Sequence, residues 1–172
     1  MTQTDGRILV AYSTAAGSTA EVAEAIGDAI EGIEVDVRRA RQVKDVSPYK
    51  AVILGSGIRA GRVYREALNF LERHQAALRQ MPVAYFVVCL TMMEDTEENR
   101  CEVEAYVDQM RQAAPQVEPV EVGLFGGKMD FKELSLPIRL IIKAMKTPEG
   151  DFRDWDAIRA WAKELKPKLT TT

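Results

Sequence analysis

The sequence predicts an α/β protein built on a doubly wound parallel sheet, and three features of the chain support this prediction. A length of 172 residues suits one domain with a sizeable core. Short apolar segments of strand length recur, and most are separated by segments whose apolar residues have helical spacing. Strands that alternate with helices, without an internal repeat or a linker rich in Pro, Gly or Ser, are typical of an open parallel sheet covered on both faces.

Five apolar segments are expected to form the strands of this sheet. Because short, largely apolar segments of this length are typical of a parallel sheet, each strand is expected to be buried on both sides. The five segments are Ile8–Tyr12, Ile33–Val37, Ala51–Gly55, Val83–Cys89 and Val120–Leu124.

Four amphipathic helices are expected between and after these strands, each with an apolar stripe that can cover the sheet. The stripes are Val22, Ile26, Ala29 and Ile30; Ala67, Phe70, Leu71 and Leu78; Val103, Tyr106, Val107 and Met110; and Trp155, Ile158, Trp161, Ala162 and Leu165. The third helix should end before Pro115, and Asp154 is a suitable N-terminal cap for the last. We expect one folded domain over residues 7–167, between a flexible start (1–6) and a flexible C-terminal tail (168–172).

The composition excludes several classes of protein. Apolar residues make up 47% of the chain and charged residues 28%, as in ordinary globular proteins. The net charge is −3 and basic residues form no stripe, which argues against a nucleic-acid partner. The longest apolar run, Met81–Leu90, contains a proline and is far shorter than the ~20 residues of a membrane helix. Met1–Gly6 lack the apolar segment of a secretory signal, so we expect a cytoplasmic protein.

The two cysteines are expected to be structural thiols. Cys89 lies in an apolar strand-like segment and Cys101 in a charged helical one, and their spacing matches neither a metal site nor a redox pair. We therefore expect no metal.

Ligands of doubly wound sheets bind outside the carboxyl ends of the strands, where the strand order reverses. The loops that follow the predicted strands are therefore the candidate binding elements. They are Ser13–Thr19, Ser56–Tyr64, Leu90–Thr96 and Phe125–Lys132.

The first of these loops has the chemistry of a phosphate site. Its residues Thr14, Ala15, Ala16, Gly17, Ser18 and Thr19 offer three hydroxyls and a run of backbone N–H groups without a bulky side chain. The N-terminus of the following helix adds free N–H groups and the positive end of its dipole, so the loop can bind a dianion without Lys or Arg. Neither a Walker loop nor a dinucleotide fingerprint is present. Local chemistry leaves an alternative open, in which Ser18 and Glu21 form only a capping box.

The segment Val10–Ile26 resembles the signature of the flavodoxins. The matching residues are Tyr12, Thr14, Gly17, Thr19, Ala23 and Ile26. This resemblance implies a five-stranded, flavodoxin-like parallel sheet with strand order 2-1-3-4-5 and a bound flavin mononucleotide (FMN). It also implies that side chains of Thr14, Ser18 and Thr19, and the backbone of Ala15, Ala16 and Gly17, contact the FMN phosphate.

The segment Gly55–Tyr64 resembles the menaquinone-dependent protoporphyrinogen dehydrogenases, which share an Ile-Arg-x-Gly core at this point. The resemblance extends over most of the chain, through Leu136–Met145 and Asp154–Leu165. It implies that two loops border the flavin. Their bordering residues would be Ser56, Gly57, Ile58 and Arg59 in the second loop and Thr91 and Met92 in the third. Stacking on the flavin ring would fall to Tyr64, or to Met92 and Met93.

Two arginines of the second loop are candidates for recognising an anion. Arg59 and Arg62 could face the pyrimidine edge of the flavin or a carboxylate of a substrate such as a porphyrin, for which a guanidinium fork is well suited. The alternative is that they are solvated loop arginines, which we favour for Arg62 and not for Arg59.

Three further features are expected to be structural. His74 falls on the apolar side of its helix and is interpreted as a packed residue. The acidic stretch Glu94–Glu104 is interpreted as the solvated start of a helix. The segment Leu136–Met145 combines an apolar stripe with a basic one (Arg139, Lys143, Lys146). This helix either packs on the sheet with a wet basic face, which we favour, or lies on an anionic membrane surface, where a quinone would be found.

Three functions remain open. The favoured one is a flavin oxidoreductase that passes electrons from a reduced substrate, such as protoporphyrinogen, to a quinone, in which the cofactor does the chemistry and no catalytic acid or base is needed. A second is an electron-transfer flavodoxin that docks on redox partners. A third is an interaction module that has the flavodoxin fold but no cofactor. The enzyme would be cytoplasmic, with peripheral contact to the inner face of the membrane if the basic helix binds lipid.

Overall fold

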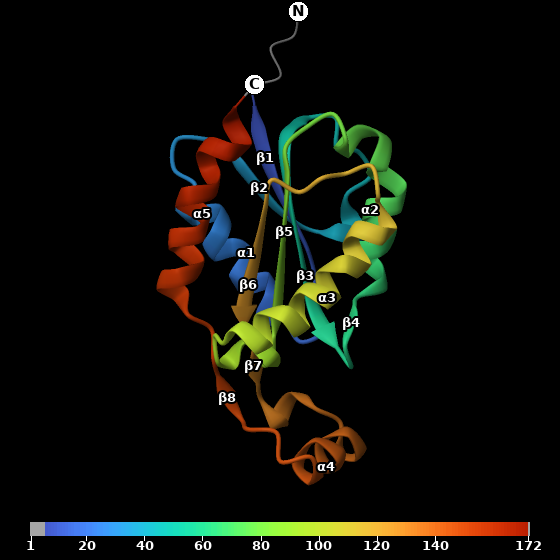
Figure 1. The fold of residues 1–172 in the computed structure, drawn as a ribbon, viewed down its shortest axis with the longest axis vertical. Helices are drawn as coiled ribbons and strands as arrows, with labels where there is room; N and C mark the ends of the chain where they lie inside the picture. The colour runs from blue at the N-terminus through green and yellow to red at the C-terminus, as the bar shows by residue number, and fades with distance from the viewer. Residues whose placement is uncertain (1–5, 172) are drawn as a thin grey trace, which may run out of the picture.

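The fold is centred on a parallel sheet. The computed structural model describes residues 6–171, so the predicted flexible start falls almost entirely outside the described residues. The parallel strands are β1 (Arg7–Ser13), β2 (Val35–Arg39), β3 (Tyr49–Arg59), β5 (Val83–Cys89) and β6 (Glu121–Gly126), in the order β2-β1-β3-β5-β6 (Figure 1). Without the short strand β4, this is the predicted order 2-1-3-4-5, and the predicted fold class is confirmed.

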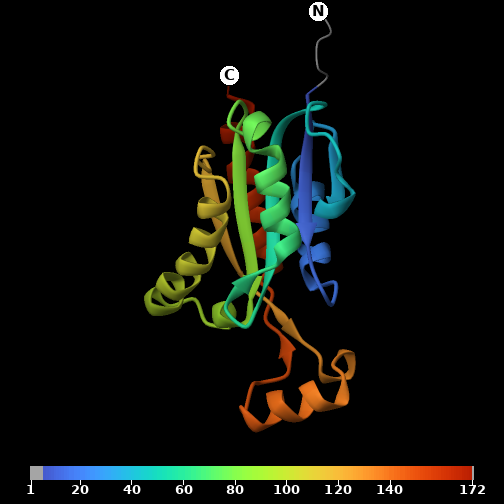
Figure 2. The same ribbon diagram turned by 90° about the vertical axis from the view of Figure 1, so that its right-hand side faces the viewer.

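Helices cover both faces of the sheet (Figure 2). On one face lie α1 (Ser18–Ala29) and α5 (Trp155–Thr170), and on the other α2 (Arg65–Leu78) and α3 (Glu97–Ala113). Adjacent residues of a strand point to opposite faces, so Ile8 and Val10 pack with α1 and α5 while Leu9 and Ala11 pack with α2 and α3. All four side chains are fully buried. This explains why β1 reads as a continuous apolar run. The edge strand β2 is only half-buried to exposed, so the expectation that each strand is buried on both sides is wrong there.

The ends of the elements follow local signals in several places. Strand β5 has the predicted bounds, α3 ends before Pro115, and the Asp154 carboxylate caps α5 by accepting a hydrogen bond from the Ala157 N–H at 3.0 Å. The predicted C-terminal tail needs correction. Helix α5 continues to Thr170, and Leu169 is buried in the core that α5 shares with α1.

The second predicted loop is an ordered hairpin. Strand β3 extends to Arg59 and pairs antiparallel with β4 (Arg62–Val63) through a two-residue turn. Both turn residues, Ala60 (φ 50°) and Gly61 (φ 72°), have left-handed backbone conformations, as a type I′ turn requires.

An excursion leaves the sheet between β6 and α5 and protrudes beyond the carboxyl ends of the strands (Figures 1 and 2). It contains β7 (Lys128–Met129), the 3₁₀ turn η3 (Phe131–Glu133), α4 (Leu136–Ala144) and β8 (Gly150–Asp151). Strands β7 and β8 pair antiparallel and form its stem.

Helix α4 was expected to pack on the sheet, and this expectation is wrong. Its side chains Leu136, Leu140, Ile141 and Met145 are 60–69% exposed. The helical spacing of apolar residues predicts that a helix has an apolar side. It does not predict which surface, if any, packs against that side. Within residues 6–171, no helix has both the length and the apolar character needed to cross a bilayer.

Candidate functional site

The predicted binding loops converge at one edge of the sheet. Strands β1, β3 and β5 are neighbours, and the chain turns to opposite sides after β1 and β3, which makes this edge the switch point of the sheet. The loop after β1 contains Thr14–Thr19, and the end of β3 contains Ser56–Arg59. The 3₁₀ turn η2 (Leu90–Met93) follows β5 and contains Thr91 and Met92.

The loop after β1 folds around the hydroxyl of Thr14. The Gly17 N–H donates to Thr14 Oγ1 at 3.0 Å, and Gly17 adopts a left-handed conformation (φ 93°) as it starts α1. A side-chain atom added at Gly17 would meet nothing within 4 Å. Ala15 and Ala16 are exposed. The loop therefore presents open backbone on its outer side.

The free donors of this loop fit a phosphate group. Within the described part of the chain, the hydroxyls of Ser18 and Thr19 and the amides of Ala15 and Ala16 donate to no protein acceptor. The first-turn amides of α1, such as that of Thr19, have no acceptor within the helix. Together these groups offer several N–H and O–H donors to an anion at the positive end of the helix dipole. They fit the phosphate monoester of FMN.

The capping-box alternative for this loop is wrong. Gly17 is the N-cap residue and Ser18 is already the first residue of α1, so its side chain makes no capping hydrogen bond. The Glu21 carboxylate pairs with Arg153 instead. Ser18 therefore keeps its hydroxyl free.

The end of β3 joins the first two loops. The Ser56 hydroxyl donates to the Gly57 carbonyl at 2.6 Å and lies within hydrogen-bond distance of the Ser13 hydroxyl and the Tyr64 N–H. Ser56 is fully buried, so its polar capacity is used within the protein. A Cβ atom at Gly57 would lie 3.1 Å from Thr19 Oγ1 and 3.0 Å from the Tyr64 ring. The absence of a side chain at Gly57 thus lets the phosphate loop and the hairpin touch.

The hairpin displays two arginines directly opposite each other. Arg59 pairs with Arg62 in the register of β3 and β4, both are exposed, and neither pairs with a carboxylate among residues 6–171. Gln109 of α3 fixes the turn, because it accepts from the Val63 N–H (3.1 Å) and donates to the Gly61 carbonyl (2.9 Å). Two like charges are therefore held close together on an ordered element. Ile58, before them, is half-buried.

Tyr64 lies half-buried behind the hairpin. Burial raises the pKa of its phenol, because the phenolate loses solvation, and the nearby positive charge of Arg59 opposes this rise. The ring borders Gly57, because a Cβ atom added there would lie 3.0 Å from it.

The third loop presents one of its two methionines. Met92 is 6% exposed and packs in the core, whereas Met93 is 39% exposed. Thr91 is half-buried. Cys89, at the end of β5, is a free buried thiol whose pKa is raised mainly by burial, as expected of an unreactive residue.

Two arginines that touch the phosphate loop were missed by the sequence analysis. Arg39, at the end of β2, donates to the Thr14 carbonyl at 2.9 Å. Arg153, after β8, lies within 3.3 Å of the Ser18 carbonyl. Their partners are 25 and 135 residues away in the sequence, so no local spacing could have indicated these contacts.

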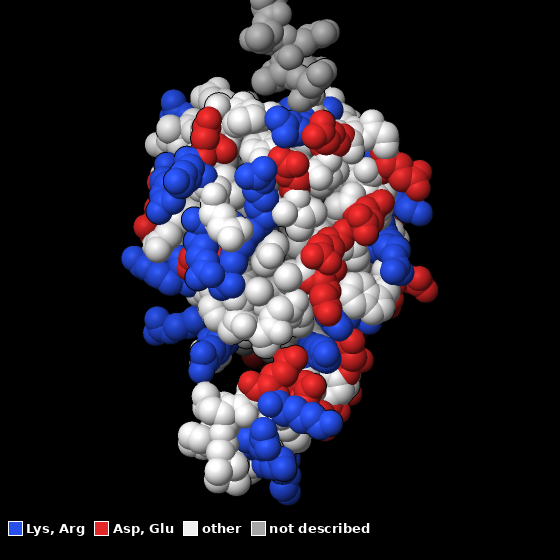
Figure 3. All heavy atoms as spheres, turned by 180° about the vertical axis from the view of Figure 1, so that it is seen from behind, with Lys and Arg blue, Asp and Glu red and all other residues white. Residues whose placement is uncertain are grey.

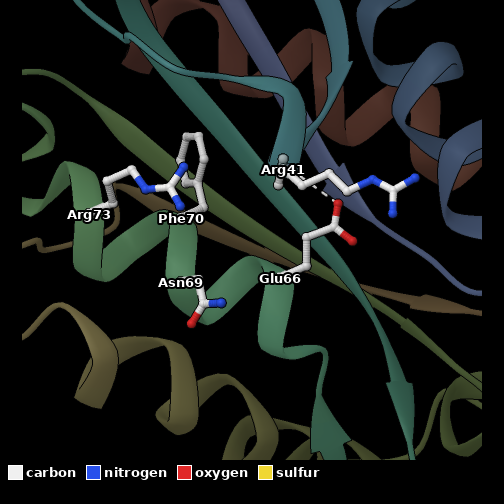
Figure 4. A pocket seen from close by; sticks show the side chains of 6 residues that line it. Arg41, Glu66, Asn69, Phe70 and Arg73 are labelled. Atoms are coloured by element: carbon white, nitrogen blue, oxygen red, sulfur yellow. Dashed lines mark hydrogen bonds between the residues drawn. The ribbon is translucent and has the colours of Figure 1, made fainter.

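Two hollows of the described surface do not include the loop Thr14–Thr19 in their lining. A cavity of about 260 Å³ lies between α2 and the 3₁₀ turn η1 (Ala40–Gln42), where the Glu66 carboxylate accepts from the Arg41 N–H at 3.2 Å (Figure 4). It is smaller than most cofactor sites. A wider groove of about 590 Å³ runs from Arg62 along α2 and α3. His74 is buried against Phe70, as predicted, and opens into neither.

The chain is similar to flavodoxin domains and to protoporphyrinogen IX dehydrogenases. The model of the flavodoxin domain family matches residues 9–156. Protoporphyrinogen IX dehydrogenase (quinone) of Leishmania major is 26% identical over 174 residues, which cover 92% of this chain and 74% of that protein. The Escherichia coli protein of the same name is 23% identical over 172 residues, covering 92% of this chain and 94% of its own.

Solved structures show the same fold. A flavodoxin from the domain Archaea aligns with a TM-score of 0.58 at 20% identity, over 96% of this chain and 99% of its own. Oxidised flavodoxin 2 from Bacillus cereus aligns with a TM-score of 0.62 at 19% identity, over 95% of this chain and 99% of its own.

The family match spans most of the chain and includes the loop after β1, the end of β3 and η2. Flavodoxin domains are FMN-binding domains, and the free donors of Thr14–Thr19 have the chemistry that the FMN phosphate needs. Family and loop chemistry agree on FMN as the cofactor. By the extent of this match and by its fold, the chain belongs to the flavodoxin domain family.

Proposed function

We propose that this protein is an FMN-dependent oxidoreductase that oxidises an anionic organic substrate, such as protoporphyrinogen, and passes the electrons to a quinone. The observation that carries the proposal is the pair Arg59 and Arg62, opposed on an ordered hairpin and without carboxylate partners in the described part of the chain. The similarity to protoporphyrinogen IX dehydrogenases supports the substrate class and the quinone.

Different residues of the chain are proposed to bind the phosphate, the flavin ring and the substrate. The amides and hydroxyls of Thr14–Thr19 would hold the phosphate, and the backbone at Gly57 and Ile58, together with Thr91, would border the flavin. Tyr64 or Met93 would stack on the flavin ring, since Met92 is buried in the core. The bound FMN supplies two-electron redox chemistry. Arg59 and Arg62 bind carboxylates of the substrate and keep them beside the ring.

Helix α4 supports a peripheral contact with the membrane, where a quinone is dissolved. It presents exposed Leu136, Leu140, Ile141 and Met145 beside the basic residues Lys143 and Lys146. In Figure 3, uncharged surface and a group of basic side chains lie side by side on the protruding lower part of the molecule. An apolar face with a basic flank suits the surface of an anionic bilayer.

Replacing Arg59 and Arg62 together by Gln tests the proposed substrate recognition. Each charge-assisted contact to a carboxylate contributes about 1.5–3 kcal/mol, so kcat/KM for protoporphyrinogen should fall at least about ten-fold. Reoxidation of the reduced flavoprotein by a neutral menaquinone analogue should be unchanged, and so should the FMN content. Stopped-flow absorbance of the flavin measures both half-reactions.

A matched control removes two positive charges elsewhere, by Arg79→Gln just after α2 with Lys163→Gln on α5. Both residues are exposed and lie outside the hairpin. Equal losses in the control and the Arg59/Arg62 variant would show a general effect of net charge and would contradict the proposed role of the hairpin.

An electron-transfer flavodoxin is the second candidate, and one observation favours it. The exposed carboxylates Glu94, Glu97 and Glu98 follow η2 directly, so an acidic surface borders the candidate site and could steer a basic redox partner. If the wild-type flavoprotein shuttles single electrons between a reductase and a haem protein but oxidises no porphyrinogen with a quinone, the carrier function is the correct one.

A further inference from the structure

We propose that Arg39 and Arg153 are positioning residues that give the Thr14–Thr19 loop its selectivity for a phosphorylated flavin over a neutral one. The loop itself contains no basic residue. These two guanidinium groups, which belong to other segments, contact the carbonyls of Thr14 and Ser18 near its two ends. The inference rests on the proposed placement of the FMN phosphate in this loop.

Arg39 holds the first peptide of the loop. Its Nη2 donates to the Thr14 carbonyl at 2.9 Å, while Nε donates to Glu66 Oε1 at 3.1 Å and Nη2 also approaches Glu66 Oε2 at 3.2 Å. The side chains of Arg39 and Glu66 are only 29% and 18% exposed. The hydrogen bonds to Glu66 raise the pKa of Arg39, so the guanidinium stays charged. The Arg39 guanidinium thus links β2 to α2 and to the loop after β1.

Arg153 holds the other end of the loop. Its side chain is 5% exposed, lies 4.6 Å from the centre of the Trp155 ring, and contacts the Ser18 carbonyl at 3.3 Å. Asp151 accepts two hydrogen bonds from the guanidinium, at 2.8 Å and 2.7 Å, and Glu21 of α1 accepts a third. The hydrogen bonds to Asp151 are the main cause of the raised pKa of Arg153. The stem of the excursion is thereby fastened to the start of α1.

Because of the geometry of the peptide bond, a contact to a loop carbonyl also orients the N–H group of the next residue. In a trans peptide the C=O and the next N–H point in opposite directions. A guanidinium that holds the Thr14 carbonyl therefore fixes the direction of the Ala15 N–H. The Ser18 carbonyl already lies in the first turn of α1, and the contact with Arg153 further restrains it and the Thr19 N–H. The Ala15 and Thr19 N–H groups are two of the donors that remain free for a phosphate.

Both arginines act mainly by orientation, because their charges are already balanced. Glu66 neutralises Arg39, and Asp151 with Glu21 more than neutralises Arg153. Loss of either arginine would leave its carboxylates unpaired beside the loop, where they would repel a phosphate dianion. A neutral riboflavin would experience neither the lost orientation nor the repulsion.

The test measures FMN and riboflavin binding to the full-length apoprotein, by quenching of flavin fluorescence. In Arg39→Gln and in Arg153→Gln, the dissociation constant for FMN should rise at least about ten-fold, the size expected for one lost hydrogen bond to a charged group. The constant for riboflavin should change less than about two-fold, since the phosphate makes the difference. A purely structural role would weaken both ligands equally, and that result, or no change for either, would overturn the inference.

Arg7→Gln is the matched control. Arg7 is also a strand-end arginine that pairs with a carboxylate, Asp36 at 3.4 Å, but it lies at the opposite end of β1 from the loop. It should leave the ratio of the two constants unchanged, and a change equal to that of the other variants would also overturn the inference.

Two more variants keep the outcome clear. Glu21→Gln covers the case in which Arg153→Gln folds poorly, because it leaves Arg153 held by Asp151 and removes one negative charge. FMN should then bind equally or more tightly. A loss of FMN binding without a loss of riboflavin binding would contradict the proposal. Thr19→Ala should weaken FMN selectively if the phosphate lies in this loop. If it does not, the placement of the phosphate is wrong. If it does while the arginine variants bind normally, only the inference about the arginines is wrong.

Discussion

The pKa of His74 is determined mainly by the burial of its side chain. It is the chain's one histidine, is 8% exposed, and stacks at an angle on Phe70 with ring centroids 4.8 Å apart. Among residues 6–171, its Nε2 atom has no hydrogen-bond partner. Burial is therefore the main cause of its lowered pKa, because the imidazolium would lose its solvation.

The lowered pKa of His74 predicts a loss of stability in mild acid. The unfolded chain takes up a proton as the pH falls through 6.5, whereas the folded chain resists protonation to a lower pH. The contribution is thus fully present above pH 6.5 and is lost as the pH falls toward the folded pKa. Urea unfolding of the apoprotein at about pH 7.5 and about pH 5.5 should show a larger drop for wild type than for His74→Phe. Identical drops would contradict this assignment.

Residue chemistry in the phosphate loop could be predicted from its sequence, but the contacts that hold the loop could not. Hydroxyls and small residues before a helix are a local pattern, so Thr14–Thr19 could be recognised from the sequence as a candidate phosphate loop. The interaction of Arg39 with Thr14 depends on neighbouring strands, and that of Arg153 on the return of the chain from the excursion. Ser56 was predicted to border the flavin, and its burial between Ser13 and Tyr64 depends on the hairpin register.

At the scale of elements, the hairpin β3–β4 contains a suboptimal residue. Ala60 has φ 50°, a conformation that costs most L-residues about 1–2 kcal/mol and that Asn tolerates better. Ala60→Asn creates the Asn-Gly pair favoured in type I′ turns and should raise the free energy of unfolding by about 0.5–1 kcal/mol. Ala60→Val should lower it, because a β-branched residue disfavours this conformation. Chemical denaturation of the two variants measures the difference, and a stabilising Val would contradict the turn assignment.

Elements with a clear period could be predicted from the sequence, and the shortest ones could not. Strand β5 is a seven-residue apolar run and was predicted with its observed bounds. Strands β4, β7 and β8 have two residues each, which is too short for any alternation to be visible. Strand β3 was predicted to end at Gly55, where its apolar run ends, and its pairing with β5 and β4 extends it to Arg59.

At the scale of the whole molecule, the protruding helix α4 predicts binding to anionic lipid. Leu136, Leu140, Ile141 and Met145 are exposed, and Lys143 lies 5.5 Å from the centre of the Phe131 ring. The protein should sediment with phosphatidylglycerol vesicles and less so as salt is raised, because charge attraction is screened. Leu140→Ser with Ile141→Ser should abolish sedimentation while FMN content is retained.

The result with uncharged phosphatidylcholine vesicles separates the two contributions of α4. Wild-type protein should bind them more weakly, since only the apolar side contributes. Equal binding of the Ser variant and the wild type to anionic vesicles would contradict the proposed contact. Ala160→Ser on α5, an exposed change away from α4, serves as the control.

The order of the sheet and the position of the excursion differ in how far the sequence could predict them. Alternating strands and helices imply a parallel sheet, and the resemblance to flavodoxins implied its order. The excursion follows no such rule. Its direction is set by two hydrogen bonds, Gly127 N–H to the Cys89 carbonyl (3.0 Å) and Phe152 N–H to the Gly127 carbonyl (2.9 Å), which join residues distant in sequence.

These two hydrogen bonds also make the excursion a natural insertion point. Gly127 and Phe152 lie side by side, and an added Cβ at Gly126 would come within 2.3 Å of the Phe152 carbonyl, so the chain leaves and re-enters the sheet at almost the same place. A segment whose two ends meet can change in length or composition without moving the strands that flank it. Evolution could therefore lengthen, shorten or exchange this segment, and with it the exposed surface of α4, while the loop after β1 stayed as it is.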